Sequence, residues 1–295
     1  FHNIYNLLMP ELPEIEIVKR SLFKMINKAK IIDIKINNKN LRYKIPHTFS
    51  KSLINEKILK ISRRSKYLIF HFKKKLLLVH LGMTGKLLLT KNYDNTIFKT
   101  SFYYDTNVHS KHNHILFELN NGSVLIYNDV RRFGFFKLYN TTQLNKIIFI
   151  KRLGLEPFSK IFNVEYFEKF TKNRKKNIKN LLMDQTFVSG LGNIYVNEAL
   201  FLSKIKPSRT CNSLNKNEIK NLILNIKKIL KFAISKGGSS VRDFQNTLGK
   251  SGNFQQFFHV YGQKNKKCSR ISCKGKIKKI VISNRSSFYC NRCQI

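Results

Sequence analysis

Short strand-like segments, in which apolar residues recur, run through the first half of the chain. They are separated by turn signals such as Asn37-Asn38, Gly82 and residues 120–122, because asparagine and glycine tolerate the backbone angles of tight turns. The segments are residues 31–36, 67–72, 76–79, 115–119 and 124–127. Regular short strands after one helix predict a β-sandwich over about residues 10–140.

From about residue 150 to residue 236 the apolar residues recur at helical spacing instead. Residues 215–218 read Asn-Lys-Asn-Glu, which is the pattern of a capping box at a helix start. The apolar positions that follow it at helical spacing are Ile219, Leu222, Ile223, Ile226, Ile229 and Leu230. Gly237-Gly238 is then expected to end this helix, since glycine readily takes the left-handed conformation of a C-cap.

From about residue 259 the chain becomes basic and rich in cysteine. Four of the five cysteines lie in the last 28 residues, in the order Cys268-x4-Cys273-x16-Cys290-x2-Cys293. Two such pairs predict a four-thiolate, tetrahedral zinc site, which is structural because no coordination position stays open. Disulfides are the alternative, but we expect no export signal, and thiols stay reduced in the cytosol. Cys211 stands alone and is expected to be a buried, small apolar residue.

These patterns together predict an α+β multidomain protein with domains at residues 10–140, 150–258 and 259–295. Its 56 Lys and Arg residues against 16 Asp and Glu give a net charge of +40, which indicates a polyanionic partner such as nucleic acid. Lys, Asn and Ile are frequent throughout, so part of this charge reflects coding bias. No apolar run reaches the ~20 residues that span a bilayer, and we expect no membrane partner, no secretory signal and a cytoplasmic protein.

Acidic residues are rare, and three of them lie within residues 11–16, where chance would place about 0.3. Glu14 and Glu16 fit the first turn of a helix beginning near Pro13, because acids complement the positive end of the helix dipole. This interpretation does not account for Met9-Pro10-Glu11, which precedes the helix. If Met9 is the initiator and is removed, Pro10 becomes an N-terminal amine.

An N-terminal amine has a pKa near ~8, so far more of it is nucleophilic at neutral pH than of a lysine side chain. A proline amine that adds to a sugar also yields an iminium, which is necessarily cationic and promotes elimination. Glu11 could transfer the protons that this chemistry requires.

Pro-Glu-Leu-Pro-Glu after a methionine resembles the opening of the formamidopyrimidine-DNA glycosylases, bifunctional repair enzymes that excise oxidised purines and nick the strand. The eight residues before Met9 depart from the family pattern. If they were retained, Pro10 would be an amide and the mechanism would fail. We therefore expect Met9 to be the true start; the alternative is an inactive chain with a genuine extension.

The resemblance extends to further positions of the first domain. Residues 63–68 are similar to the strand whose lysine, here Lys66, approaches the lesion and its phosphate. Residues 80–85 resemble the loop whose methionine, here Met83, fills the gap left by an extruded base, as a flexible apolar side chain can. In residues 129–134, Arg131 matches the residue that contacts the orphaned base and Phe133 matches the aromatic wedge.

Residues 111–114 resemble a Lys-His-Asp-His segment in which His112 is the DNA-binding match, whereas His114 is expected to be hydrogen-bonded within the β-domain. In the helical domain, residues 190–195 resemble the helix-two-turn-helix hairpin, with Asn193 at a helix start that could face a phosphate. Arg174 matches a DNA-binding lysine.

Residues 237–240 and 246–254 match the region that covers the extruded base. The zinc ribbon of the family usually has two residues within its first pair of ligands rather than four. Arg285, five residues before the third ligand, matches the arginine that grips the phosphate beside the lesion and takes part in the second elimination.

The implied protein is a cytoplasmic, nucleoid-associated bacterial repair enzyme, a monomer that binds damaged double-stranded DNA and holds one structural Zn2+ per chain. It removes 8-oxoguanine and formamidopyrimidines through Pro10, with Glu11, Lys66 and Arg285 assisting β,δ-elimination, and needs no other cofactor. The alternatives are an endonuclease VIII-like glycosylase for oxidised pyrimidines, although that group opens Pro-Glu-Gly-Pro and position 12 here is leucine, or a non-catalytic nucleic-acid-binding zinc-ribbon protein if Pro10 is not the mature N-terminus.

Overall fold

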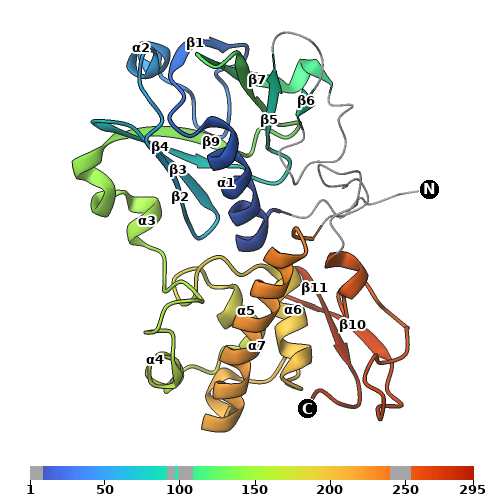
Figure 1. Ribbon diagram of the computed structural model, residues 1–295. Helices are drawn as coiled ribbons and strands as arrows, with labels where there is room; N and C mark the ends of the chain where they lie inside the picture. The colour runs from blue at the N-terminus through green and yellow to red at the C-terminus, as the bar shows by residue number, and fades with distance from the viewer. Residues whose placement is uncertain (1–8, 92–96, 99–108, 240–253) are drawn as a thin grey trace. The chain divides into compact units, whose positions relative to one another are not determined.

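The computed structural model describes the backbone of residues 9–91, 97–98, 109–239 and 254–295 and, apart from residues 91, 97, 98 and 145, their side chains. These residues form two compact units (Figure 1). The first contains the described residues up to 150 together with 236–239, and the second contains residues 151–235 and 254–295. The expected cover over residues 246–254 therefore falls, except for Phe254, outside the described residues.

Two antiparallel sheets make up most of the first unit. Their strand orders are β1-β7-β8-β5-β6 and β2-β3-β4-β9. The strands are β1 (Ile31–Ile36), β2 (Lys60–Arg64), β3 (Tyr67–His71), β4 (Lys75–His80), β5 (Lys86–Lys91), β6 (Ile97–Phe98), β7 (Asn113–Leu119), β8 (Ser123–Asn128) and β9 (Phe135–Asn140). Leu77 and Phe136 of one sheet and Leu87 and Phe117 of the other belong to one buried core. The predicted β-sandwich is confirmed.

Alternation alone does not describe the first of these strands. The pairing of β1 with β7 shifts register between Ile31 and Asp33, and Ile32 is 49% exposed while Ile31 and Ile34 are buried. A bulge adds one residue, so the apolar positions on either side of it still face the core. The sequence patterns also did not single out β2, β5, β6 and β9.

Helix α1 (Leu12–Ile26) begins at a capping box. The side chain of Glu11 accepts the backbone N–H at the third helical position, and the side chain of Glu14 accepts the N–H of Glu11 at 2.9 Å. Pro13 lies in the first turn, where its missing N–H costs nothing. The helix packs on β2 and β3 and buries one apolar stripe, Leu12, Ile15, Val18, Leu22 and Ile26. Helix α2 is Phe49–Leu53 and α3, at the boundary of the units, is Ile148–Lys151.

The second unit is helical and ends in a two-stranded hairpin. Its elements are α4 (Val164–Thr171), α5 (Ile178–Met183), α6 (Asn193–Leu202), α7 (Lys216–Ser235), β10 (Ile277–Ile282) and β11 (Arg285–Cys290). The predicted capping box is confirmed, because Asn215 and Glu218 exchange side-chain to backbone hydrogen bonds of 2.9 Å in both directions. The apolar positions expected on this helix are its buried face, and Gly237 and Gly238 follow it with φ of 83°.

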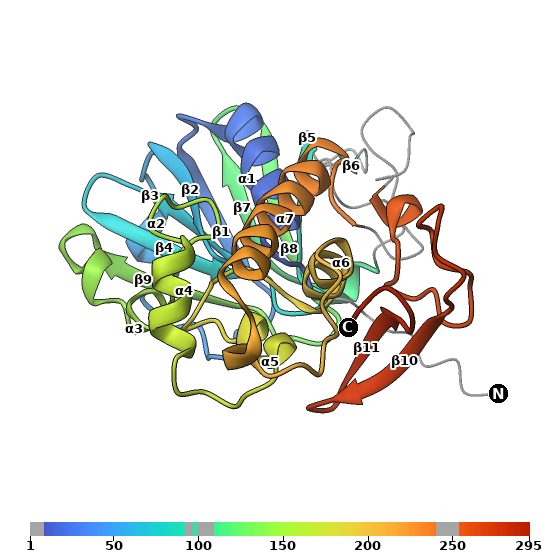
Figure 2. The same cartoon turned by 90° about the horizontal axis from the view of Figure 1, so that it is seen from below.

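Helix α6 is the centre of this unit, between α7 and the hairpin of β10 and β11 (Figure 2). Its residue Glu198 is fully buried and accepts backbone N–H groups from His259, Val260 and Tyr261 at 2.8–3.0 Å. This carboxylate fixes the segment that leads into the cysteine-rich end. Of the helices that the structure describes, none has the length and apolar character needed to cross a bilayer.

Candidate functional site

Pro10 and Glu11 lie at the start of α1. Pro10 is half-buried, and its nitrogen forms the amide bond with Met9 in this chain. Glu11 is 3% exposed, and its carboxylate is fixed beside Pro10 because it also caps the helix. The capping box therefore gives one residue of the predicted catalytic pair a single, rigid orientation.

Glu14 connects the helix start to the segment after α7. Its Oε1 accepts hydrogen bonds from the backbone N–H of Ser239 at 2.9 Å and from the Ser239 hydroxyl at 3.0 Å. A Cβ on Gly238 would lie 3.2 Å from the same carboxylate oxygen, at a φ of +83°. The chain thus enters residues 240–253, outside the described residues, from a point fixed on α1.

Glu16 orients the turn that carries Lys66. Arg63 donates to Glu16 Oε2 at 3.1 Å and to the carbonyl of Ser65 at 2.9 Å. Burial raises the pKa of Glu16, but hydrogen bonds from Lys19, Arg20 and Arg63 outweigh it and leave that pKa below its usual value. The carboxylate is charged and holds Arg63 in place.

Lys66 itself occupies the two-residue turn between β2 and β3, after Ser65, whose φ is +54°. The expectation of a strand residue is therefore corrected to a turn residue. The side chain of Lys66 is half-buried at this turn.

Met83, Arg131 and Phe133 come together on two neighbouring loops, although they lie far apart in sequence. The Arg131 guanidinium donates to the sulfur of Met83 at 3.2 Å and lies 4.4 Å from the centre of the Phe133 ring. Arg131 and Phe133 are exposed and Met83 is half-buried. The three residues predicted to fill the space of an extruded base thus form one cluster.

Asp129 holds these loops together, and the sequence patterns gave it no role. It is fully buried and accepts hydrogen bonds from the Tyr127 hydroxyl at 2.8 Å, the Gly134 N–H at 3.0 Å and the Arg131 N–H at 3.2 Å. A fourth, short hydrogen bond comes from the Thr84 hydroxyl. The rarity of acids in this chain, which revealed the cluster at residues 11–16, was also the available signal here.

Three histidines near this cluster have distinct environments. His114 is buried and hydrogen-bonds the carbonyl of Asp129 at 2.7 Å, as expected. Burial and the Lys66 and Arg42 cations lower the pKa of His80 to about 4, and its Nδ1 accepts the N–H of Gly82 at 3.0 Å. Desolvation and then the neighbouring Lys111 lower the pKa of His112. His80 is therefore neutral at pH 7 and serves as a hydrogen-bonding group.

In the second unit, Arg285 follows the tight turn between β10 and β11. Ser283 and Asn284 both have positive φ, 47° and 59°, which is the conformation of the two-residue turn that suits twisted hairpins. Arg285 begins β11 and is exposed. The hairpin therefore presents this arginine at its tip.

Helices α5 and α6 support that tip. The buried Lys179 donates to the Ser286 carbonyl at 3.0 Å and to the Ser287 hydroxyl at 2.6 Å. Asn193 donates to the same carbonyl at 3.1 Å, so its side chain is engaged with the hairpin. Asn193 is the first residue of α6, and backbone N–H groups at such a position are the ones that bind anions.

Arg174 and Cys211 meet at the edge of the helical region. Arg174 is exposed, and its guanidinium lies 4.0 Å from the centre of the Phe170 ring. Cys211 is fully buried and its thiol donates to the carbonyl of Arg174 at 3.1 Å, while burial raises the pKa of that thiol. The prediction that Cys211 is an inert, buried residue is consistent with this environment.

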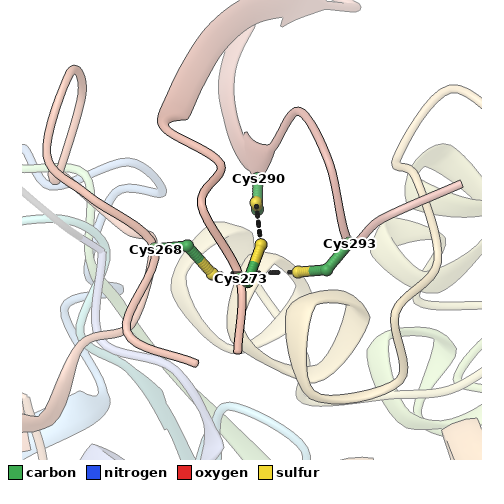
Figure 3. A group of neighbouring side chains, drawn as sticks. All are labelled: Cys268, Cys273, Cys290 and Cys293. Carbon is green, nitrogen blue, oxygen red and sulfur yellow. Dashed lines mark hydrogen bonds between the residues drawn. The ribbon is translucent and has the colours of Figure 1, made fainter. Parts of the chain in front are cut away.

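The four C-terminal cysteines converge on one point (Figure 3). Their sulfur atoms all lie within 4.8 Å of one another, and the Cys268–Cys293 and Cys273–Cys290 distances are 3.8 and 3.6 Å. Sulfurs bound to a tetrahedral zinc at about 2.3 Å are ~3.8 Å apart. The donor set and the spacing both fit one structural zinc ion, and four thiolates leave no position for substrate.

The unusual spacing of the first pair does not prevent this convergence. Arg270, between Cys268 and Cys273, donates to the carbonyls of Phe201 and Leu202 at 2.8 and 3.0 Å. These are among the last carbonyls of α6, which lack partners within the helix. The longer loop thus binds the ribbon to the C-terminal end of α6.

Comparison with known proteins agrees with this geometry. The sequence profile of the formamidopyrimidine-DNA glycosylase N-terminal domain matches residues 9–136, that of the family's H2TH domain matches residues 153–245, and that of the zinc finger found in FPG and IleRS matches residues 265–295. The formamidopyrimidine-DNA glycosylase of Bartonella tribocorum is 42% identical over 97% of this chain and 100% of its own length. The chain belongs to the formamidopyrimidine-DNA glycosylase family.

Other members of the family give the same result. The formamidopyrimidine-DNA glycosylase of Rickettsia africae is 40% identical over 97% of this chain and 99% of its own. A crystal structure of a glycine-to-proline mutant of Lactococcus lactis FPG with Fapy-dG-containing DNA superposes with a TM-score of 0.85, 37% identity and coverage of 97% and 99%. A formamidopyrimidine-DNA glycosylase is a base-excision repair glycosylase for oxidised purines and an AP lyase, and this chain is such an enzyme.

Proposed function

We propose that the mature protein begins at Pro10 and that the Pro10 nitrogen is the nucleophile of both the glycosylase and the lyase reaction. The observation that supports this most is the position of Glu11, a buried carboxylate fixed beside Pro10 by the capping box of α1. The family profile begins to match at Met9, the residue whose removal would free the amine.

The chemistry follows from the properties of a secondary amine. The Pro10 lone pair attacks C1′ of the damaged nucleotide, and the C1′–N bond breaks as the purine leaves with its electron pair and takes up a proton. Opening of the C1′–O4′ bond, with protonation of O4′, gives a cationic iminium. We assign to Glu11, the next residue in the chain, the transfer of these protons and of the proton that the Pro10 nitrogen loses after its attack.

The iminium acidifies the C2′ proton, because the electron pair released from the C2′–H bond can move toward the cationic nitrogen. Loss of that proton expels the 3′ phosphate, and a second elimination expels the 5′ phosphate. As the family resemblance implies, we assign Lys66, which approaches the lesion and its phosphate, and Arg285 to these eliminations, and Arg285 also to the phosphate beside the lesion and to the second step. The rigid supports of both residues, Arg63 for the turn of Lys66 and Lys179 for the hairpin of Arg285, favour these roles.

Damaged duplex DNA is the proposed substrate form. A purine cannot react at C1′ while it is stacked, so the nucleotide must be turned out of the helix. The cluster of Met83, Arg131 and Phe133 is suited to fill the space, with an apolar side chain, a cation for the orphaned base and an aromatic ring. Among the Lactococcus lactis structures, one contains Fapy-dG DNA, another abasic-site DNA and another oxidised-pyrimidine DNA, and each is a complex with damaged DNA.

His112, Arg174 and the start of α6 at Asn193 are proposed to contact the DNA backbone, and the enzyme to act as a monomer on the nucleoid. We propose three domains: a catalytic domain of residues 10–140, a domain of residues 150–258 that binds DNA and covers the lesion, and a zinc finger of residues 259–295. Sedimentation of the protein with and without lesion-containing duplex tests the monomer; a species of two chains per duplex would contradict it.

Borohydride trapping tests the proposal as a whole. Protein verified by mass to begin at Pro10 should form a covalent adduct with duplex containing 8-oxoguanine opposite cytosine, because only an iminium is reduced to a stable amine. The matched control is the same chain with Met9 retained, which should bind but form no adduct. A chain beginning at Pro10 that cleaves the duplex without ever being trapped would overturn the assignment of Pro10.

A further inference from the structure

A cleft in the first unit opens beside the Met83–Arg131–Phe133 cluster and has no assigned ligand. Its volume is about 630 Å3, large enough for part of a polymer or for a mononucleotide. Its walls come from two segments distant in sequence, and the lining residues are Asn40, Leu41, Arg42, Arg131, Arg132 and Phe133. Three of these six residues are arginines and none is acidic.

The two walls are fixed to each other. The backbone N–H of Arg42 donates to the carbonyl of Gly134 at 3.3 Å, and Asn40 is held in a turn by the side chain of Asn38 at 2.8 Å. On the opposite wall Arg132 has a φ of +55°, a conformation that only well-supported non-glycine residues adopt. The successive residues Arg131 and Arg132 both line the cleft.

The charge of the cleft is not balanced within the described part of the protein. Arg131 is engaged with the Met83 sulfur and the Phe133 ring. Across residues 9–91, 109–239 and 254–295, no ion pair involves Arg42 or Arg132, and both are exposed. Two guanidinium groups that face an open cleft without a carboxylate are suited to an oxyanion, which they can bind through paired N–H groups.

We propose that this cleft binds a backbone phosphate of the strand opposite the damaged base, with Arg42 and Arg132 as its ligands. The inference rests on the proposed function, in which Arg131 and Phe133 face that strand. Both residues also line the cleft, whereas the groups assigned to the lesion strand, Pro10, Glu11 and Lys66, do not. The site would hold the undamaged strand while its partner nucleotide is turned out.

The test varies both the DNA and the protein. Duplexes with a tetrahydrofuran abasic-site analogue would carry one neutral methylphosphonate at a time, in either strand near the lesion, and be titrated with wild type, Arg42→Gln and Arg132→Gln. Each variant should bind the unmodified duplex about tenfold more weakly, and its salt dependence should fall by about one phosphate contact. A methylphosphonate at one position in the opposite strand should weaken the binding of wild type by the same factor of about ten. On that duplex wild type and the variants should then bind with equal affinity.

Arg152→Gln, which removes an exposed arginine outside the cleft, is the matched control. Its affinity relative to wild type should be the same on the unmodified duplex and on the duplex that carries that methylphosphonate. The proposal is overturned if the affinity difference between wild type and these variants disappears only when the methylphosphonate is in the lesion strand. It is also overturned if no methylphosphonate position in either strand removes that difference. Borohydride trapping at saturating enzyme reports on Pro10 and not on the cleft. Its failure in wild type would contradict the proposed function while leaving the binding measurement readable.

Discussion

The carboxylate of Asp129 accepts a short hydrogen bond from the hydroxyl of Thr84, and this contact joins the loop of Met83 to the loop of Arg131. Arg131 completes the junction, because its backbone N–H donates both to the Thr84 hydroxyl at 3.0 Å and to Asp129 at 3.2 Å. The spacing of the groups that would enter the DNA stack is thus set by a fully buried carboxylate.

Thr84→Val should loosen this junction without changing the volume of the side chain. We expect weaker discrimination between bases opposite 8-oxoguanine, by about tenfold, because the hydrogen bond to the Asp129 carboxylate and the one accepted from the Arg131 N–H are both lost. Cleavage of single-stranded abasic DNA, which has no orphaned base, should stay at the wild-type rate. Thr84→Ser keeps the hydroxyl and should restore discrimination; a serine variant as poor as valine would show that the hydroxyl is not responsible.

Asp129→Asn should reduce stability as well. The substituted amide can accept fewer hydrogen bonds and brings its own N–H groups toward the donors of Arg131 and Gly134. We expect a loss of about 1–3 kcal/mol in the free energy of unfolding, measured by urea denaturation. A loss below the error of that measurement would contradict the role of the carboxylate as the common acceptor of the two loops.

Lys179→Met should act on the hairpin that presents Arg285. The substitution keeps a long side chain but removes the hydrogen bonds to Ser286 and Ser287. We expect the second elimination to slow by about tenfold, the effect of ~1.4 kcal/mol in positioning, with trapping through Pro10 unchanged at saturating enzyme. The ratio of β- to β,δ-elimination products on a gel measures this; an equal fall in both steps would indicate general unfolding instead.

His80 should make stability depend on pH. Its pKa of about 4 in the folded protein lies below its ordinary value of 6.5, so the unfolded chain takes up a proton first as the pH falls. The contribution of the buried, neutral His80 to the free energy of unfolding is fully present above pH 6.5 and is lost between about pH 6.5 and 4. It amounts to about 3 kcal/mol. The glutamine of His80→Gln cannot titrate, so the stability of this variant relative to wild type should rise as the pH falls through this range. Urea denaturation measures the free energy of unfolding of both proteins from pH 7 to 4.5. A difference between them that does not change with pH would contradict this prediction.

Much of the fold followed from local patterns, because the capping box at Asn215, the buried stripe of α7 and the cysteine spacing each lie within a short stretch of chain. The residues that hold the site in place could not be predicted from such local patterns. Lys179 is 107 residues from Ser286 and Thr84 is 45 residues from Asp129, and one lysine among 56 basic residues has nothing local to distinguish it. Such contacts arise only when the packing of distant elements is known.

Loss of zinc should unfold the cysteine-rich end and weaken DNA binding. Elemental analysis should find one zinc per chain, and Cys273→Ser should lose it, because a hydroxyl is a poor ligand in place of a thiolate. Cys211→Ala is the matched control: Cys211 is buried outside the cluster, so this variant should retain the full zinc content. Without zinc the hairpin loses its anchor, and Arg285 loses the support on which lesion binding depends. We therefore expect Cys273→Ser to bind abasic duplex at least about tenfold more weakly than Cys211→Ala, whereas equal affinity would show that the Arg285 hairpin folds without the metal.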